Sequence, residues 1–273
     1  MILFPNCKIN LGLHILRKRE DGYHDLQTIF YPFPLKDALE VVRHPSPPVT
    51  DVEYSGSGLQ VQGDLSNNIC IKAYHLLKQD FPDLAPVKMH LHKTIPMGAG
   101  LGGGSADGAF TLLLLNQKFN LGLSEEALLQ YALQLGSDCP FFIRNQPSFA
   151  TGRGEILEPI SLDLSGYQFV VVNPGIHVNT GWAFSQIRPM AERPSLKEIV
   201  QKPVETWKES LSNDFESPVS RQHPQIGRIK NLLSEQGAVY AAMTGSGSTV
   251  FGIFSKEAKP ELDFPPSYFV RIV

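Results

Sequence analysis

The sequence predicts an α+β protein with two domains. Its 273 residues suffice for one large or two medium domains with an ample core. Residues 87–93 alternate between apolar and polar side chains, which is typical of a strand, and a run of glycines then leads into an apolar helix at residues 109–115. Further strands and helices follow a boundary that we place between residues 151 and 166. We therefore predict domains over residues 1–155 and 156–273.

The composition is that of an ordinary folded chain. Hydrophobic residues make up 42% and charged residues 19%, which excludes a disordered chain, and the net charge of −3 argues against a broad nucleic-acid surface. No stretch is long and apolar enough to cross a bilayer, and no targeting segment is recognisable. Cys7, Cys70 and Cys139 have neither metal-site spacing nor a disulfide pattern. We expect a cytoplasmic protein with no nucleic-acid or membrane partner.

The N-terminal part begins with a strand and a hairpin. Residues 6–16 alternate, which places Lys8 and Asn10 on the same face. The dipeptide Asp21-Gly22 predicts a hairpin turn. The elements expected after it are a strand over 38–43, an irregular connection over 44–57, a helix over 68–77 entered through Ser66-Asn67, and a helix over 124–135 capped by Ser124.

Residues 96–106 form the stretch from which a function is inferred. Five glycines fall within seven residues, between the predicted strand and the predicted helix. Glycine lets the backbone approach a ligand closely, and the free N–H groups at a helix start attract anions. Ser105 adds a hydroxyl group at the start of the helix. The segment is therefore interpreted as a phosphate-binding loop.

Three other interpretations of these glycines are weaker. A Walker loop requires lysine where Gly104 stands. The dinucleotide fingerprint matches at Gly98, Gly100 and Gly103, but it requires a strand after the helix, where residues 124–135 predict a second helix. A tight turn without a ligand does not need five glycines, each of which costs about 0.5–1 kcal/mol of backbone entropy.

Two further groups complete a set suited to phosphoryl transfer. Lys8 would be either a solvated strand residue or a cation for a phosphate. Asp138 precedes an apolar, proline-containing turn; caps and turns explain most such residues, but apolar neighbours also raise the pKa of a general base. Phosphoryl transfer needs a held triphosphate, charge neutralisation and a group that deprotonates the acceptor. Tyr23 and His24, beside the hairpin turn, are by themselves ordinary solvated residues.

The C-terminal part supplies the second set of elements. The small-residue loop at 244–248 is either a tight hairpin or a segment that packs against the first glycine loop. The elements expected are strands over 168–172, 237–243, 249–254 and 268–273, a short helix through Phe184 capped by Asn179 or Thr180, and polar helices over 189–235 interrupted by prolines.

Three motifs resemble those of the GHMP kinases, the superfamily of galactokinase, homoserine kinase and mevalonate kinase. Residues 96–106 are similar to the second motif, residues 5–13 to the first, and residues 243–251 to the third. The resemblance implies an N-terminal α/β domain like domain 2 of ribosomal protein S5 and a C-terminal ferredoxin-like α+β domain. It also implies ATP-dependent phosphorylation of a small-molecule alcohol, with Mg²⁺ accompanying the ATP.

Within the superfamily, one branch is favoured by residues 19–24, 26–28 and 102–104 and by Asp138 with the phenylalanines that follow it. They resemble the kinases that phosphorylate the 2-hydroxyl of a cytidine-diphosphate-linked methylerythritol in non-mevalonate isoprenoid (terpenoid) biosynthesis. Another small-molecule kinase, acting on homoserine or a sugar, is the alternative. A non-catalytic ATP sensor on the same fold is disfavoured by the presence of Lys8 and Asp138, and an RNA-binding module by the net charge.

The resemblance also implies roles for individual residues. Lys8 and Asp138 would be the catalytic pair, Asn10 would help to bind the substrate, and Tyr23 and His24 would hold the cytosine by stacking and by an edge hydrogen bond. ATP would be bound by Pro96, Met97, Gly98, Ala99, Gly100, Leu101, Gly102, Gly103, Gly104, Ser105 and Ala106, together with Lys93 and Asn68, and the substrate further by Thr180 and Phe184.

No residue is assigned as a metal ligand, and a monomer or weak homodimer is expected. Cys7 stands where the motif usually has alanine, which predicts sensitivity to thiol reagents.

Overall fold

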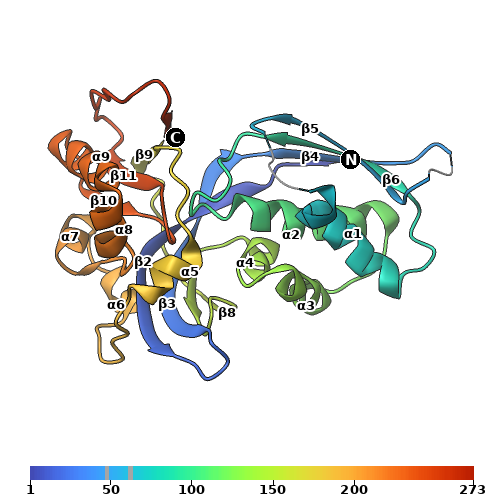
Figure 1. The fold of residues 1–273 in the computed structure, drawn as a ribbon, viewed down its shortest axis with the longest axis horizontal. Coiled ribbons are helices and arrows are strands. Elements are labelled where there is room, and N and C mark those ends of the chain that lie inside the picture. Colours follow the sequence, from blue (N-terminus) through green and yellow to red (C-terminus); the bar gives the residue numbers. More distant parts are fainter. Residues whose placement is uncertain (47–48, 61–63) are drawn as a thin grey trace. The chain divides into compact units, whose positions relative to one another are not determined.

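A computed structural model describes residues 1–46, 49–60 and 64–273 (Figure 1). The chain forms two compact units, each assembled from several segments. Unit 1 comprises Met1–Cys7, Phe33–Met97 and Gly102–Gln146, and unit 2 comprises Lys8–Pro32, Gly98–Leu101 and Pro147–Val273. The predicted division at residue 155 remains a prediction. Among the described residues, no helix has the length and apolar character needed to span a bilayer.

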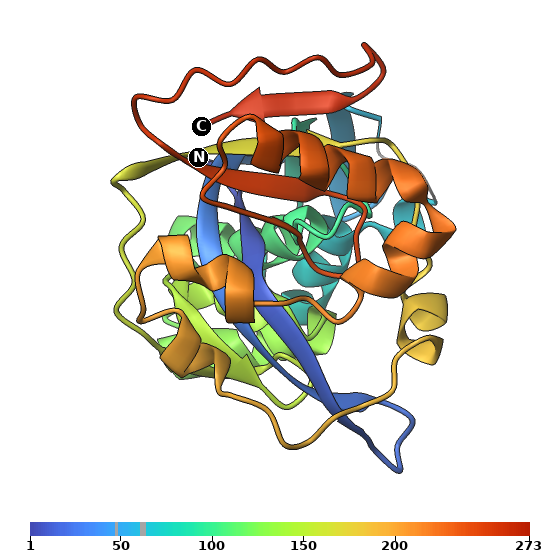
Figure 2. The same ribbon diagram turned by 90° about the vertical axis from the view of Figure 1, so that its left-hand side faces the viewer.

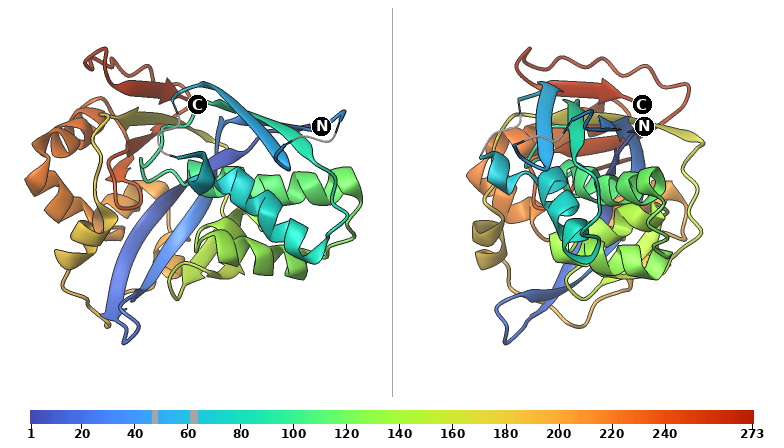
Figure 3. Two further views of the ribbon diagram at one scale, coloured as in Figure 1. Left: turned by 45° about the vertical axis from the view of Figure 1, so that its right-hand side comes forward. Right: turned by 90° about the vertical axis from the view of Figure 1, so that its right-hand side faces the viewer.

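Unit 1 contains a four-stranded sheet covered by helices. The sheet order is β1 (Ile2–Leu3), β4 (Ala38–Arg43), β6 (Val87–Lys93) and β5 (Val52–Gly58), in which only β5 and β6 are parallel. Helices α1 (Ile69–Asp80) and α2 (Gly103–Phe119) lie along one face of this sheet (Figure 3). Helices α3 (Glu125–Leu135) and α4 (Cys139–Arg144) pack against α2.

Local sequence signals set the helix ends in unit 1. The Ser124 hydroxyl accepts a hydrogen bond from the amide of Ala127, so this residue caps α3 as predicted. The cap of α1 is Asn68 rather than Ser66-Asn67, because the Asn68 side chain accepts from the amides of Cys70 and Ile71. Residues Leu65–Asn67 instead form a short 3-10 helix, η1.

The prediction of an irregular connection over residues 44–57 was wrong for its second half. Strand β5 pairs in parallel with β6 along its whole length. The serines and glycines of β5 have a weak preference for strands. The backbone of β6 nevertheless pairs with this segment, and the hydroxyl of Ser55 lies 2.8 Å from Nδ1 of His90. Pairing with β6, rather than the preference of its own residues, therefore makes residues 52–58 a strand. Residues 47 and 48 lie outside the described residues.

A second sheet contains the predicted N-terminal hairpin. Its order is β2 (Asn6–Lys18), β3 (His24–Lys36), β7 (Ser148–Thr151) and β8 (Ile156–Pro159). The turn between β2 and β3 is closed by the amide of Arg19, which donates to the carbonyl of Tyr23 at 2.8 Å. Gly22 there has a φ of 85°, which favours glycine. The hairpin prediction is thus confirmed.

The third sheet, in unit 2, has the ferredoxin-like order. Strands β10 (Tyr240–Met243), β11 (Val250–Ser255), β9 (Tyr167–Asn173) and β12 (Phe269–Ile272) lie side by side, all antiparallel. Helix α9 (Pro224–Glu235) packs on β10 and β11 (Figure 2). Residues 256–268, where this fold usually has its second helix, contain none. The first connection contains α5 (Thr180–Ser185), α6 (Leu196–Ile199), η2 (Val204–Thr206), α7 (Trp207–Ser210), α8 (Glu216–Gln222) and α9 (Pro224–Glu235).

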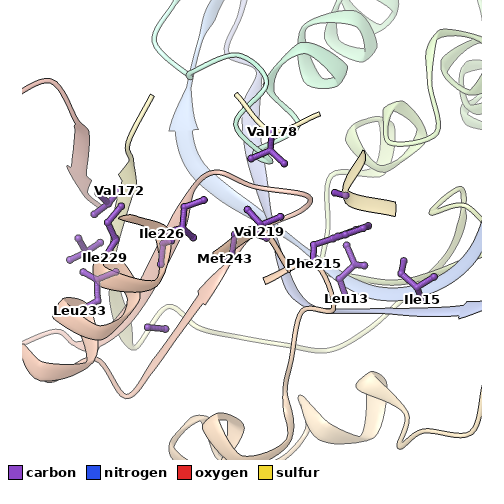
Figure 4. Close-up of a cluster of buried hydrophobic side chains, with 14 of the residues drawn as sticks. Leu13, Ile15, Val172, Val178, Phe215, Val219, Ile226, Ile229, Leu233 and Met243 are labelled. Carbon is purple, nitrogen blue, oxygen red and sulfur yellow. The ribbon is translucent and has the colours of Figure 1, made fainter. Parts of the chain in front are cut away.

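The core of unit 2 joins the sheet to its helices. Buried aliphatic side chains from strands β2, β9, β10 and β11 meet those of α8 and α9 (Figure 4). Burial of each such side chain stabilises the fold by about 1.5–3 kcal/mol. The residues labelled there are Leu13, Ile15, Val172, Val178, Phe215, Val219, Ile226, Ile229, Leu233 and Met243.

One histidine is buried in unit 2 on the polar face of β2. The ring of His14 lies between Ser212 and Gln27, with each ring nitrogen 3.2 Å from its partner atom. Burial, with a smaller contribution from the positive charge of Arg193, lowers the pKa of His14 to about 4, and the negative charge of Asp214 opposes these two effects. His14 is therefore neutral in the folded protein at neutral pH.

This burial predicts a pH-dependent stability. Because the unfolded histidine has a pKa near 6.5, the unfolded state takes up the proton first as the pH falls, so stability present above pH 6.5 is lost towards pH 4. The loss attributable to His14 should be about 3 kcal/mol. Urea unfolding of the wild type and of His14→Gln at pH 7 and pH 4 measures this loss. Titration of the carboxylates affects both proteins equally, so the difference between their pH profiles reports His14. Parallel pH profiles would contradict the prediction.

Candidate active site

The glycine loop has the backbone conformation of an anion-binding segment. Gly98, Gly100 and Gly102 have φ values of 62°, 78° and 69°, so left-handed residues alternate along the loop. Alternation of this kind turns successive N–H groups towards one point. The N-cap residue of the 17-residue helix α2 is Gly102. Because glycine has no side chain, it provides no side-chain acceptor for the first backbone amides of the helix. The loop is thus suited to bind a phosphate.

A second loop in unit 2 supports part of the first. The amide of Thr249 donates to the carbonyl of Ala99 at 3.2 Å, and the hydroxyl of Thr244 donates to the carbonyl of Gly100 at 3.1 Å. A Cβ atom at Gly100 would lie 2.2 Å from the Thr244 carbonyl oxygen. The small-residue loop is therefore both the hairpin between β10 and β11 and a packing surface for residues 98–101, and both interpretations are confirmed.

Lys8 is held by neighbours on its own strand and on β3. Its ammonium group donates to Oδ1 of Asn10 at 2.6 Å and lies 4.6 Å above the centre of the Phe30 ring. Asn10 is itself fixed, because its Nδ2 donates to Thr28 at 2.9 Å and its amide to the hydroxyl of Thr244 at 2.9 Å. Lys8 is therefore not a solvated strand residue. In this arrangement the amide oxygen of Asn10 orients the lysine.

Asp138 occupies the N-cap position of α4 without capping it. Its φ and ψ are −84° and −16°, and its side chain accepts no hydrogen bond from the first turn. The four residues that follow, Cys139 to Phe142, are all buried. The carboxylate therefore lies beside an apolar helix start and does not serve as its cap. Asp138 belongs to unit 1 and Lys8 to unit 2, and their pairing stays a prediction.

The predicted cytosine residues lie among aromatic and polar groups of unit 2. The ring of His24 stacks on Phe184 of α5, with ring centres 4.7 Å apart and an angle of 18° between the planes. Burial lowers the pKa of His24, and Lys18 lowers it further, so the neutral ring offers one donor and one acceptor at its edge. Tyr23 is 54% exposed. Thr180, the first residue of α5, has its hydroxyl 3.1 Å from that of Ser246.

A pocket of about 360 Å³ lies in unit 1 beside the start of α2. Asn68, Lys93, Met97, Gly104 and Ser105, all predicted to bind ATP, line it. Its walls are mainly apolar, which suits a flat base better than a phosphate. The remaining lining residues are Tyr54, Asp64, Leu65, Asn67, Ile69, Cys70, Leu91 and Asp107.

Lys93 is the centre of a buried ionic cluster at this pocket. Its ammonium group donates to Oδ2 of Asp37 at 2.5 Å and to Oδ2 of Asp107 at 2.6 Å, and all three side chains are almost completely buried. Burial raises the pKa of Asp107 to about 7; Lys93 opposes this shift and Asp37 adds to it. Oδ1 of Asp107 and the hydroxyl of Tyr54 are buried without a hydrogen-bond partner. Both atoms belong to residues that line the pocket, so they are candidate hydrogen-bond partners for a ligand.

The expectation that Cys7 makes the protein sensitive to thiol reagents was wrong. None of Cys7, Cys70 and Cys139 forms a disulfide, and all three are completely buried. Burial raises the pKa of Cys70 and of Cys139 to about 12. A thiol reacts as the thiolate and needs access to solvent, so none of the three is reactive in the folded protein.

The comparisons with known proteins agree with this geometry. Residues 68–146 match the GHMP kinases N terminal domain, and residues 195–263 match the GHMP kinases C terminal domain. A 4-diphosphocytidyl-2-C-methyl-D-erythritol kinase of Bacteroides fragilis is 54% identical over 269 residues, which are 98% of this chain and 97% of that protein. The chain belongs to the GHMP kinase family.

Other members of the GHMP kinase family support the same assignment. A protein of the same name from Bacteroides thetaiotaomicron is 52% identical over 272 residues, 98% of each chain. A crystal structure of 4-(cytidine 5'-diphospho)-2C-methyl-D-erythritol kinase is 32% identical, with a TM-score of 0.79 over 93% of this chain and 90% of that one. The two-domain α+β GHMP fold and the branch inferred from the motifs are thereby confirmed.

Sequence reasoning missed several residues that the structure brings to the site. Asp37 and Asp107 are 56 and 14 residues from Lys93, and no spacing rule connects them. Tyr54 was assigned to an irregular connection, so its place on β5 beside the pocket was not expected. Nothing in the sequence assigned a role to Arg153, although its guanidinium carbon lies 4.7 Å above the centre of the Tyr23 ring.

Proposed function

We propose that this protein is an ATP-dependent kinase that phosphorylates the 2-hydroxyl of 4-diphosphocytidyl-2-C-methyl-D-erythritol, in the non-mevalonate route to isoprenoid precursors. The observation that carries the proposal is the 54% identity to the Bacteroides fragilis kinase across almost both whole chains. The glycine loop, the buried lysine on β2 and the stacked histidine at the hairpin support it. A homoserine or sugar kinase of the same family is the alternative.

In the proposed reaction, the glycine loop holds the ATP phosphates through backbone amides at the start of α2. The adenosine occupies the pocket beside Asn68 and Lys93, whose apolar walls fit a base. The charge of Lys93 is balanced by Asp37 and Asp107. We therefore assign Lys93 to shaping this pocket rather than to neutralising phosphate.

Asp138 takes the proton of the 2-hydroxyl as that oxygen attacks the γ-phosphorus, and ADP leaves. Lys8, oriented by Asn10, stabilises the charge that develops on the transferred group. Asn10 thus contributes to substrate binding through the lysine that it orients. A non-catalytic sensor would need neither the lysine nor the carboxylate.

Mg²⁺ accompanies ATP in this proposal and supplies charge neutralisation. Proteins usually hold Mg²⁺ through one or two carboxylates together with substrate phosphates rather than in a dedicated cage. Within residues 1–46, 49–60 and 64–273, no group of three or more His, Cys, Asp or Glu side chains could hold a metal ion. In the proposal, the ion would take most of its ligands from the nucleotide. A cytoplasmic location and a monomer or weak homodimer complete the proposal.

An assay of ADP release over a panel of acceptors tests the function. We expect turnover with the cytidine-diphosphate-linked methylerythritol and none with homoserine, galactose or mevalonate. Each acceptor is assayed at several concentrations, so that a weak KM is not mistaken for the absence of a reaction. Turnover of homoserine or a sugar in preference to the cytidyl compound would replace the proposal with its alternative.

Replacement of His24 by alanine should weaken binding of the cytidyl substrate. The change removes one edge hydrogen bond and the ring that stacks on Phe184, so KM for the cytidyl substrate should rise about tenfold. KM for ATP should change less than twofold. His75→Ala is the matched control, because His75 is exposed on α1. An equal rise in both KM values would refute the cytosine assignment.

A further inference from the structure

Tyr23 is exposed, yet one face of its ring is covered. The ring projects beside the turn between β2 and β3, and 54% of the residue is accessible. The guanidinium carbon of Arg153 lies 4.7 Å above the ring centre, a distance typical of a cation–π contact. A planar base that stacks on Tyr23 therefore has one face available to it.

Both partners of this contact are anchored to their own backbones. The amide of Tyr23 donates to Oδ1 of Asp21 at 3.0 Å. Arg153 lies at the tip of the β7–β8 hairpin, where its amide donates to Oε2 of Glu155 at 2.6 Å. The carbonyl of Gly152 accepts from the amide of Leu26 at 2.8 Å, which ties the tip to β3. The stacking surface is thus held between two fixed turns.

The charge around Arg153 argues for a contact with the ring rather than with a phosphate. The Nε of Arg153 is 3.7 Å from Oε1 of Glu155. Arg153 also helps to lower the pKa of Asp21, an effect in which the hydrogen bond from Arg19 is the largest cause. A guanidinium paired with Glu155 and close enough to influence Asp21 is a weak partner for a diphosphate, because those carboxylates repel the phosphate oxygens.

His24, the next residue, already stacks on a ring of its own unit. One face of its ring is covered by Phe184, and Phe184 in turn meets the edge of Phe215 in the core, with ring centres 4.9 Å apart. The hairpin therefore offers one stacking face at Tyr23 and one hydrogen-bonding edge at His24. Arg153 and Phe184 fix these two elements from separate parts of unit 2.

We propose that Arg153 is a positioning residue for the pyrimidine base, which orients Tyr23 by covering one ring face and leaves the other for the base. This inference rests on the proposed function, because it presumes that the base stacks on Tyr23. Arg153 does not touch the reacting atoms, so it acts on KM for the cytidyl substrate and not on kcat. Its loss frees the Tyr23 ring to adopt other rotamers, which the base must then reorder.

The test measures binding of cytidine and of cytidine diphosphate to the purified full chain by calorimetry. Arg153→Ala should weaken both ligands by the same factor, about two- to fivefold, as expected for an exposed cation–π contact. In a Tyr23→Ala background the same substitution should have no further effect. Arg271→Ala is the matched control, since Arg271 lies 4.6 Å over the ring of Phe269 on β12.

Each other outcome overturns the inference. A loss confined to cytidine diphosphate would mean that Arg153 contacts the phosphates. A loss that persists in the Tyr23→Ala background would mean that Arg153 acts on something other than the ring. Normal binding by Arg153→Ala, with cytidine bound by the wild type, would refute the inference alone. If the wild type binds neither ligand, the proposed function fails and this inference fails with it.

Discussion

Asp138→Asn should reduce kcat about 10²- to 10⁴-fold, the usual contribution of general base catalysis. Asparagine has the same shape but cannot accept the proton of the acceptor hydroxyl. Since the Asp138 side chain does not cap α4, the substitution removes no capping interaction, and kcat should fall by a far larger factor than the folding equilibrium constant. The dissociation constant of an ATP analogue should also stay within about twofold, because the loop amides and the pocket are intact.

Three measurements on the same preparation check this expectation: the ADP release rate at saturating substrates, calorimetric binding of the ATP analogue, and urea unfolding. Asp83→Asn is the control, because Asp83 is an exposed acid in the same unit. Turnover equal to that of the wild type would remove Asp138 from the role of base. A shared loss of nucleotide binding and turnover would instead indicate a contribution to the ATP site.

Lys93→Met should lower the free energy of unfolding by about 3–5 kcal/mol, as is usual when one partner of a buried ion pair is removed. The ammonium group separates the carboxylates of Asp37 and Asp107 in a place that water does not reach. Asp37 retains the amides of Thr94 and Ile95, which donate to its Oδ1 at 2.6 and 2.9 Å. Asp107 loses its only ionic partner among the described residues.

The pH dependence of this loss has a definite sign. Burial raises the pKa of Asp107, and loss of the lysine, which opposes that shift, raises it further. Protonation of Asp107 then removes the charge that methionine leaves unpaired, so the difference in unfolding free energy between wild type and Lys93→Met should shrink as the pH falls from 7 to 4. Lys88→Met is the control, because Lys88 lies on the same strand but its side chain is 41% exposed and pairs with exposed Glu53; it should cost less than about 1 kcal/mol. A loss at Lys93 as small as that at Lys88 would contradict the assignment of the cluster.

Short-range signals made much of the fold predictable. Ser124, followed by two acidic residues, correctly predicted the start of α3. The alternation over residues 87–93 predicted both ends of β6 correctly. Helix α2 begins six residues earlier than the apolar run indicated, because glycines are permitted in the helix once its apolar part packs on the sheet. The parallel strand β5 could not be predicted, since its conformation depends on a partner more than thirty residues away.

The candidate site was predictable where the motif is continuous along the chain. The glycine loop and the pair Lys8 and Asn10 are examples, because a run of glycines and the alternation along one strand are visible in the sequence itself. Long-range partners were beyond the same reasoning. Arg153 meets Tyr23 across 130 residues of sequence, and Asp37 meets Lys93 only because β4 and β6 are adjacent strands. Contacts of this kind follow from the topology of the fold, and the topology was predicted only through the resemblance to the GHMP kinases.

The crowding at Gly100 limits which variants this protein can tolerate. Any side chain there would have to displace the main chain of Thr244, and its φ of 78° is strained for other residues. An inhibitor that accepted hydrogen bonds from the backbone amides of this bend would depend on main-chain atoms. A substitution could not alter these atoms without disturbing the turn. Resistance would then have to arise elsewhere, which makes the bend a durable target.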